Sequence, residues 1–146
     1  MDAKKKKSTT RSDTSLESLD LYTFFLDRAS ESKTLRTALQ AIGARVEIHR
    51  EFYQPDADDQ LWLPEVAAKG WVIISQDQFN ELEREAIRNA GGRAFLIVHG
   101  SATGEEQAAI VTGAMRRMLR MLKAVPAPFI ARIYRANRVL LIPKEK

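Results

Sequence analysis

Three aspartates, each next to an apolar stretch of the chain, are the residues whose type and position could support chemistry. A β-sheet formed by such stretches could bring them together. Asp27 follows the apolar residues 22–26, and Asp77 follows residues 71–75 after one glutamine. Asp59 closes an acidic loop and opens a helical segment. Because the carboxyl ends of parallel strands share one edge of an open sheet, acids from separate segments can converge there. Carboxylates bind hard cations such as Mg²⁺ or Mn²⁺, and such a centre can hydrolyse a phosphodiester.

Each of these acids also has a simpler interpretation. Asp27 can be a polar residue that leaves a strand, Asp59 is a good N-cap, and Asp77 can cap a helix that begins near residue 79. It is the joint placement of the three that favours a shared acidic site. Asp56 and Asp58 compete with Asp59 for the second position, and spacing alone does not choose between them.

The composition indicates one globular domain. The chain has 146 residues, of which 45% are hydrophobic and 29% charged. It has no cysteine, which excludes disulfides, thiolate catalysis and cysteine zinc sites. No apolar run approaches the roughly 20 residues that span a bilayer, and no apolar segment follows the basic N-terminus as in a secretory signal. We therefore expect a cytoplasmic protein with no membrane contact.

The N-terminal segment is strongly basic. Lys4, Lys5, Lys6 and Lys7 form an unbroken run, and we expect residues 1–19 to be a disordered tail before a domain at residues 20–146. The tail is either a solubilising segment or an electrostatic attraction for RNA. The net charge is +4, and half of it comes from the tail, so the domain itself is only weakly basic.

The pattern of apolar residues predicts alternating strands and helices, with stops at Gly43, Gly70 and Gly91. The predicted strands are residues 21–26, 45–49, 71–75 and 93–98, with a hairpin over 129–134 and 139–142. Helices are predicted between them, the last over residues 104–123 with Thr103 as its cap. In the second helix, Pro64 either produces a kink or moves the start towards Leu63. This order predicts an α/β fold with a mainly parallel sheet and helices on both faces.

Other reactive residue types carry less information. His49 and His99 are the only histidines, and a lone histidine after a strand is typically a surface or capping residue. Glycine-rich dinucleotide and P-loop motifs are absent. The arginines at positions 116, 117 and 120 can bind phosphate, although a solvated helix face is the commoner role of such residues.

Several segments together resemble the PIN-like domains, in particular bacterial relatives of the VapC-type toxin nucleases. The stretches that carry the resemblance are residues 24–27, 59–77, 82–96, 103–106 and 128–133. The similarity covers about residues 21–142 and implies a three-layer α/β/α PIN-like fold that ends in a hairpin. It also implies a metal-dependent ribonuclease in which Asp27, Asp59 and Asp77 are catalytic and bind Mg²⁺ or Mn²⁺. The implied partners are an RNA substrate, an antitoxin protein and a second copy of the chain.

The chain departs from the family pattern in two places, which keeps other functions open. Arg28 directly follows the first acid, where we expect it to compete for Asp27, and no clear fourth acid is present beyond Glu105 and Glu106. One alternative is therefore a non-catalytic PIN-like module that binds protein or RNA. A phosphoryl-accepting receiver domain is a further alternative, but its paired acids and its lysine after the fifth strand are missing.

Overall fold

The chain alternates strands and helices before a final hairpin, in a computed structural model that describes residues 16, 18–98 and 103–143. The elements in chain order are η1 Leu19–Leu21, β2 Thr23–Leu26, α2 Lys33–Ala41, β3 Arg45–Ile48, η2 His49–Glu51, α3 Asp59–Ala68, β4 Val72–Ser75, α4 Glu81–Asn89, β5 Arg93–Ile97, α5 Gly104–Ala124, β6 Phe129–Tyr134 and β7 Arg138–Leu141. The predicted order of elements is thus confirmed. None of the helices in these ranges combines the length and hydropathy of a bilayer-spanning helix.

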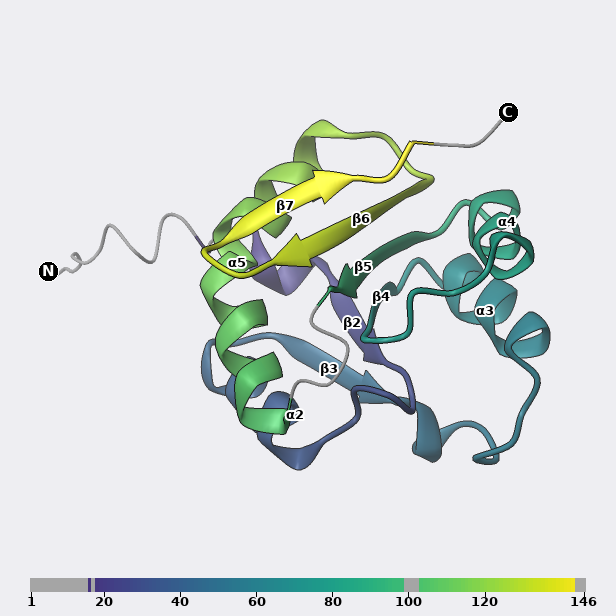
Figure 1. Ribbon diagram of the computed structural model, residues 1–146, viewed down its shortest axis with the longest axis horizontal. Coiled ribbons are helices and arrows are strands. Elements are labelled where there is room, and N and C mark those ends of the chain that lie inside the picture. The colour runs from purple at the N-terminus through teal and green to yellow at the C-terminus, as the bar shows by residue number, and fades with distance from the viewer. Residues whose placement is uncertain (1–15, 17, 99–102, 144–146) are drawn as a thin grey trace, which may run out of the picture.

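The strands form one six-stranded sheet in the order β3-β2-β4-β5-β6-β7. All neighbouring pairs are parallel except β6 and β7, which form the predicted antiparallel hairpin. Helices α2 and α5 cover one face of the sheet, and α3 and α4 cover the other (Figure 1). The fold is therefore the expected α/β/α sandwich.

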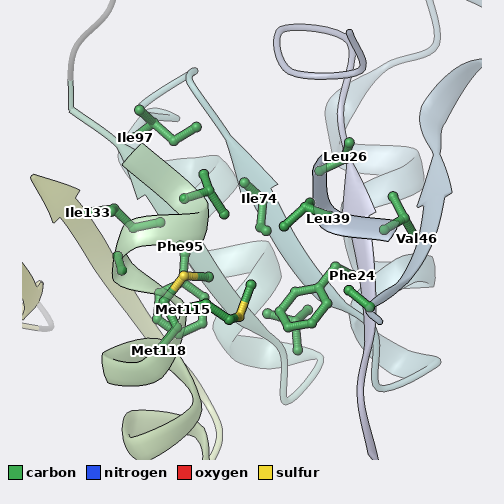
Figure 2. Packing of buried hydrophobic residues seen from close by; sticks show 14 of the residues in the cluster. Phe24, Leu26, Leu39, Val46, Ile74, Phe95, Ile97, Met115, Met118 and Ile133 are labelled. Carbon is green, nitrogen blue, oxygen red and sulfur yellow. The ribbon is translucent and has the colours of Figure 1, made fainter. Parts of the chain in front are cut away.

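The two faces of the sheet bury separate apolar clusters, because side chains alternate along each strand. Phe24 and Leu26 of β2 point to the α2 and α5 side, where Met115 and Met118 of α5 pack (Figure 2). Phe25, between them, belongs to the cluster under α3 and α4. Strand β4 is buried along its whole length, as expected for a central strand covered on both faces.

Side-chain caps fix the starts of the helices. The Ser32 side chain accepts a hydrogen bond from the Leu35 N–H at the start of α2, and Thr103 caps α5 as predicted. Helix α4 begins at Glu81 with Asn80 as its cap, so the expectation that Asp77 caps a helix from Phe79 is wrong. The capping box of Asn80 and Glu83 satisfies two backbone N–H groups and sets this start. Asp77 is thereby left outside the helix.

The start of α3 separates the competing acids. Asp58 is the N-cap, with a side-chain oxygen 2.9 Å from the Gln60 nitrogen, and Asp59 is the first helical residue. Asp59, which looked like the cap in the sequence, is thus released for other contacts. Pro64 lies inside the helix and does not move its start.

The N-terminal boundary and the third strand also differ in detail from expectation. Leu19 is 4% exposed and opens η1, and Leu16 packs against the same core. Strand β3 ends at Ile48 because His49 begins a turn of 3₁₀ helix. The fold therefore uses at least Leu16 and Leu19 from the segment expected to be a tail, while Lys4 to Lys7 lie outside the described residues.

We expect Asp58→Ala to lower the free energy of unfolding by about 1 kcal/mol, because α3 loses its N-cap. Asp58→Asn keeps an accepting oxygen at the same place and should stay close to wild type. Urea denaturation of the three proteins measures the difference. Equal stability of Asp58→Ala and wild type, or equal losses in both variants, would contradict the assigned cap.

Candidate active site

Asp27, Asp59 and Asp77 come together at the carboxyl edge of the parallel sheet. Asp27 follows β2, Asp77 follows β4, and these strands are neighbours in the sheet. Asp59 opens α3, which packs on the face that contains Phe25. The charges of Asp77 and Asp59 both raise the pKa of Asp27, so the three carboxyl groups lie within electrostatic reach of one another.

Asp27 is a buried acid held by two hydrogen bonds. Its side chain is 4% exposed, with Oδ2 2.6 Å from the Ser75 hydroxyl and Oδ1 3.1 Å from the Ala29 nitrogen. Burial raises the pKa of Asp27 to about 7, against the opposing effect of the Ser75 hydrogen bond. The charge of Asp77 contributes to this rise, and with a pKa of about 7 the carboxyl group is about half protonated near neutral pH.

Ser75 joins the loops that carry Asp27 and Asp77. Its hydroxyl donates to Asp27 and accepts a hydrogen bond from the Asp77 backbone N–H at 2.8 Å. The Asp77 side chain accepts from the Phe79 N–H at 2.8 Å, which closes a tight turn with Phe79 at a φ of 55°. Asp77 is exposed, so it forms the solvent side of the cluster while Asp27 forms its floor.

Gln78 fastens this turn to three other elements. Its side-chain nitrogen donates to the Ile97 carbonyl at 2.9 Å, and its side-chain oxygen accepts from Arg132 at 3.2 Å. Its own carbonyl accepts two hydrogen bonds from the Arg84 guanidinium. The turn after β4 is therefore tied to β5, α4 and β6, which fixes the position of Asp77.

Asp59 is oriented by a buried tryptophan and an arginine. The Trp62 indole N–H donates to Asp59 Oδ1 at 2.8 Å, and Arg28 lies 3.4 Å from the same oxygen. Arg28 also donates to the Pro55 carbonyl. The expectation that Arg28 competes for Asp27 is therefore corrected: the ion pair is with Asp59. Trp62 is fully buried in the core and also positions an acid.

Glu83 is a fourth acid that the sequence analysis missed. Its pKa is raised by burial first, and then by the neighbouring side chains of Asp59 and Asp77. The feature of the sequence that could have drawn attention to Glu83 was the capping box at residues 80–83, directly after Asp77. Of the acids considered instead, Glu106 completes the Thr103 capping box at the start of α5 and lies 3.6 Å from Arg135.

The donor set fits a hard divalent cation in its chemistry, because four carboxyl groups gather and the charges of Asp59 and Asp77 raise the pKa values of Asp27 and Glu83. The positions of these carboxyl groups in the structure do not fit a bound cation. Among the described residues, no group of three or more histidine or acidic side chains is arranged to hold a metal ion. Asp59 faces Arg28 and Glu83, and both oxygens of Asp27 accept hydrogen bonds. A shared cation would therefore require movement of side chains, Asp59 foremost.

His49 lies beside this cluster but not at the surface, where it was expected. It is fully buried against the rings of Phe25, Tyr53 and Trp62. Neither ring nitrogen has a hydrogen-bond partner within the described part of the chain, and burial, followed by the charge of Arg28, lowers its pKa. The ring is therefore a neutral packing element. His99 lies outside the described residues.

The free energy of unfolding of Asp27→Asn should exceed that of wild type by an amount that increases as pH rises. In the unfolded chain the acid loses its proton near its ordinary pKa of 3.8, whereas the folded protein keeps it to about pH 7. The native state thus binds more protons across this window, and wild-type stability falls as pH rises from 4 to 7. The variant lacks this loss. The difference in free energy of unfolding between the variant and wild type should therefore grow between pH 5 and pH 8, to roughly 4 kcal/mol at most.

Urea denaturation in EDTA at both pH values measures this difference, with the exposed Asp56→Asn as the control. The lowered pKa of His49 acts equally in each protein and cancels in the comparison. Parallel stability profiles for Asp27→Asn and wild type would refute a raised pKa at this position.

Comparison with known proteins gives one match. No curated protein and no solved structure shows significant similarity to the chain. A family model described as a PIN like domain matches residues 23–99, more than half of the 146 residues. The matched segment contains Asp27, Asp59, Asp77 and Glu83. The chain, which has the alternating fold and the acidic sheet edge described above, therefore belongs to the PIN-like domain family.

Proposed function

We propose that the protein is a divalent-cation-dependent ribonuclease whose active site is the cluster of Asp27, Asp59, Asp77 and Glu83. The observation that carries the proposal is the buried Asp27, whose pKa is raised to about 7 beside other acids at the sheet edge. A buried carboxyl group without a counter-charge is costly, and a cation relieves that cost. This chain also belongs to the PIN-like domain family, in which nuclease activity is common.

The residues of the chain have distinct roles in this proposal. A bound Mg²⁺ or Mn²⁺ supplies Lewis-acid polarisation of the phosphate and an activated water. Asp27 and Asp77 hold the site in place, because Ser75 and the Asp77 turn fix their geometry. Asp59 and Glu83 would complete the set of residues that hold the cation, which requires that Arg28 no longer pair with Asp59. Arg28 is 42% exposed, which places it to transfer from Asp59 to an RNA phosphate.

We expect Asp27→Asn, Asp59→Asn, Asp77→Asn and Glu83→Gln each to lower the rate of RNA cleavage by about 100-fold or more. Changes to residues around metal ligands already cost about 10–100-fold, and these are the ligands themselves. A labelled mixed-sequence RNA with Mn²⁺ provides the assay, and EDTA should abolish cleavage in wild type. Asp56→Asn is the matched control. Unchanged rates in the Asp27 and Asp77 variants would exclude this site.

A second candidate function is a non-catalytic PIN-like module. The observation in its favour is Arg28, whose guanidinium pairs with Asp59 and is also bound to the Pro55 carbonyl. An arginine held in this way supplies the positive charge that a cation would otherwise provide. The absence of a metal-ready group among the described side chains points the same way.

Arg28→Gln separates the two candidates. For the nuclease, removing the competing guanidinium should tighten Mn²⁺ binding by several-fold, measured as a larger cation-induced shift in melting temperature. For the module, neither wild type nor Arg28→Gln should bind the cation. The same titration on Asp27→Asn shows whether any shift comes from the acidic site.

The cellular role and the partners are further proposals. We infer that the nuclease acts in the cytoplasm as the toxin of a toxin–antitoxin pair, blocked by a small antitoxin protein, and that two copies of the chain associate. Growth arrest on expression in a bacterial host, absent in Asp27→Asn, supports the toxin role. Normal growth with active wild-type enzyme argues against it.

Lys4, Lys5, Lys6 and Lys7 are proposed to attract RNA to the domain. Replacing all four with glutamine should weaken RNA binding and flatten its dependence on salt, because fewer counterions are released. This variant is preferable to deletion of residues 1–19, since Leu16 and Leu19 pack in the core. Fluorescence anisotropy across a salt series measures the effect. An unchanged affinity and slope would assign the run a solubilising role.

A further inference from the structure

Helix α5 carries three arginines that the acidic site does not use. Arg116, Arg117 and Arg120 are exposed and line one cavity of about 320 Å³. Residues three and four apart lie on one face of a helix, so Arg120 is a neighbour of both Arg117 and Arg116. No acidic side chain pairs with any of them within the described ranges. Like charges at this spacing weaken a helix, which makes the arrangement unfavourable without a ligand.

The cavity is a groove between α5 and the turn of the β6–β7 hairpin; we call it the arginine groove. Its remaining lining is Leu16, Thr112, Gly113 and Asn137. Gly113 allows the hairpin turn to approach the helix closely, because a Cβ at this position would lie only 2.6 Å from the side-chain oxygen of Asn137. Asn137 has a φ of 63°, so the left-handed turn is what brings its amide over the helix.

The chemistry of the groove suits phosphate groups. Guanidinium groups donate in a fixed fork that matches phosphate oxygens, and asparagine and threonine side chains commonly contact a nucleic-acid backbone. At about 30 Å³ for each water, the volume corresponds to about ten water molecules. This is more space than a single phosphate group requires, so the groove has room for a polyanion.

We propose that the arginine groove binds the phosphate backbone of RNA, at a site separate from the acidic cluster. Two observations favour RNA over a free anion. In the sequence, the run from Lys4 to Lys7 precedes Leu16, which lines the groove, by only nine to twelve residues, and it adds positive charge that a polyanion can use. Helix α5 also lies on the opposite face of the sheet from α3 and α4, so only a ligand as long as an RNA strand could reach both the groove and the acidic cluster (Figure 1).

The choice of RNA as the polyanion rests on the proposed ribonuclease function, but binding to the groove does not depend on cleavage. Binding is therefore measured in EDTA, by anisotropy of a fluorescein-labelled single-stranded RNA with the full chain. Weaker binding in the groove variants, with normal binding in the active-site variants, would separate the two sites. If Asp27→Asn loses cleavage but still binds RNA, this would also show that the two sites are separate.

The double variant Arg116→Gln, Arg120→Gln should bind RNA at least about ten-fold more weakly. The slope of log affinity against log salt should fall by about 1.4, at about 0.7 for each single-strand phosphate that is no longer neutralised. The matched control is Lys33→Gln, Arg45→Gln, which removes the same charge from exposed positions on α2 and β3. Because it relieves like-charge repulsion, the groove variant should not lower the melting temperature.

Asn137→Asp tests the geometry with a nearly isosteric change. A carboxylate over the groove should repel phosphate and weaken RNA binding, whereas Gln40→Glu on exposed α2 adds the same charge elsewhere and should not. The proposal is overturned if the control variants weaken binding as much as the groove variants. It is also overturned if polyglutamate, or inorganic phosphate at millimolar concentration, displaces the RNA as well as unlabelled RNA of equal charge.

Discussion

The hydrogen bond between the Ser75 hydroxyl and the buried carboxyl group of Asp27 is the contact on which the site depends. It joins the ends of two neighbouring parallel strands at 2.6 Å, in a place that is almost closed to solvent. Through the Asp77 N–H the same serine sets the turn after β4. The apolar packing of β2 and β4 between two helical layers makes this burial unavoidable. The sheet therefore holds Asp27 in a buried environment that disfavours the charged form of its carboxyl group.

The cost of that burial is what connects the fold with its proposed chemistry. The charges of Asp59 and Asp77 raise the pKa values of Asp27 and Glu83, and Arg28 pairs with Asp59 alone among these acids. The structure shows the state in which Arg28 pairs with Asp59, and the proposed nuclease requires a second state in which a cation takes the place of Arg28. The nuclease and the non-catalytic module differ in which of these states prevails in the cell.

The fold was largely predictable from the sequence, because continuous apolar runs and glycine stops mark buried strands and helix ends with little ambiguity. The first and third predicted site acids were placed by the same logic, since each follows a neighbouring strand. Asp59 was harder, because the choice between Asp58 and Asp59 as the cap of α3 depends on one hydrogen bond, from the Gln60 N–H to the Asp58 side chain. Glu83 was missed because its local role in a capping box hides its long-range contact with Asp59. Contacts of this kind depend on helix packing and have no periodic signal.

The measurement that tests the central claim most directly is proton release on Mn²⁺ binding. Calorimetric titration at pH 7 in two buffers of different ionisation enthalpy yields it, because a ligand carboxyl group must lose its proton when the cation binds. With a pKa of about 7, Asp27 should contribute about half a proton per cation at pH 7 and almost none at about pH 8.5. Asp27→Asn should remove that contribution. Binding without proton release at pH 7, or no binding in the folded wild type, would contradict a cation site built on Asp27.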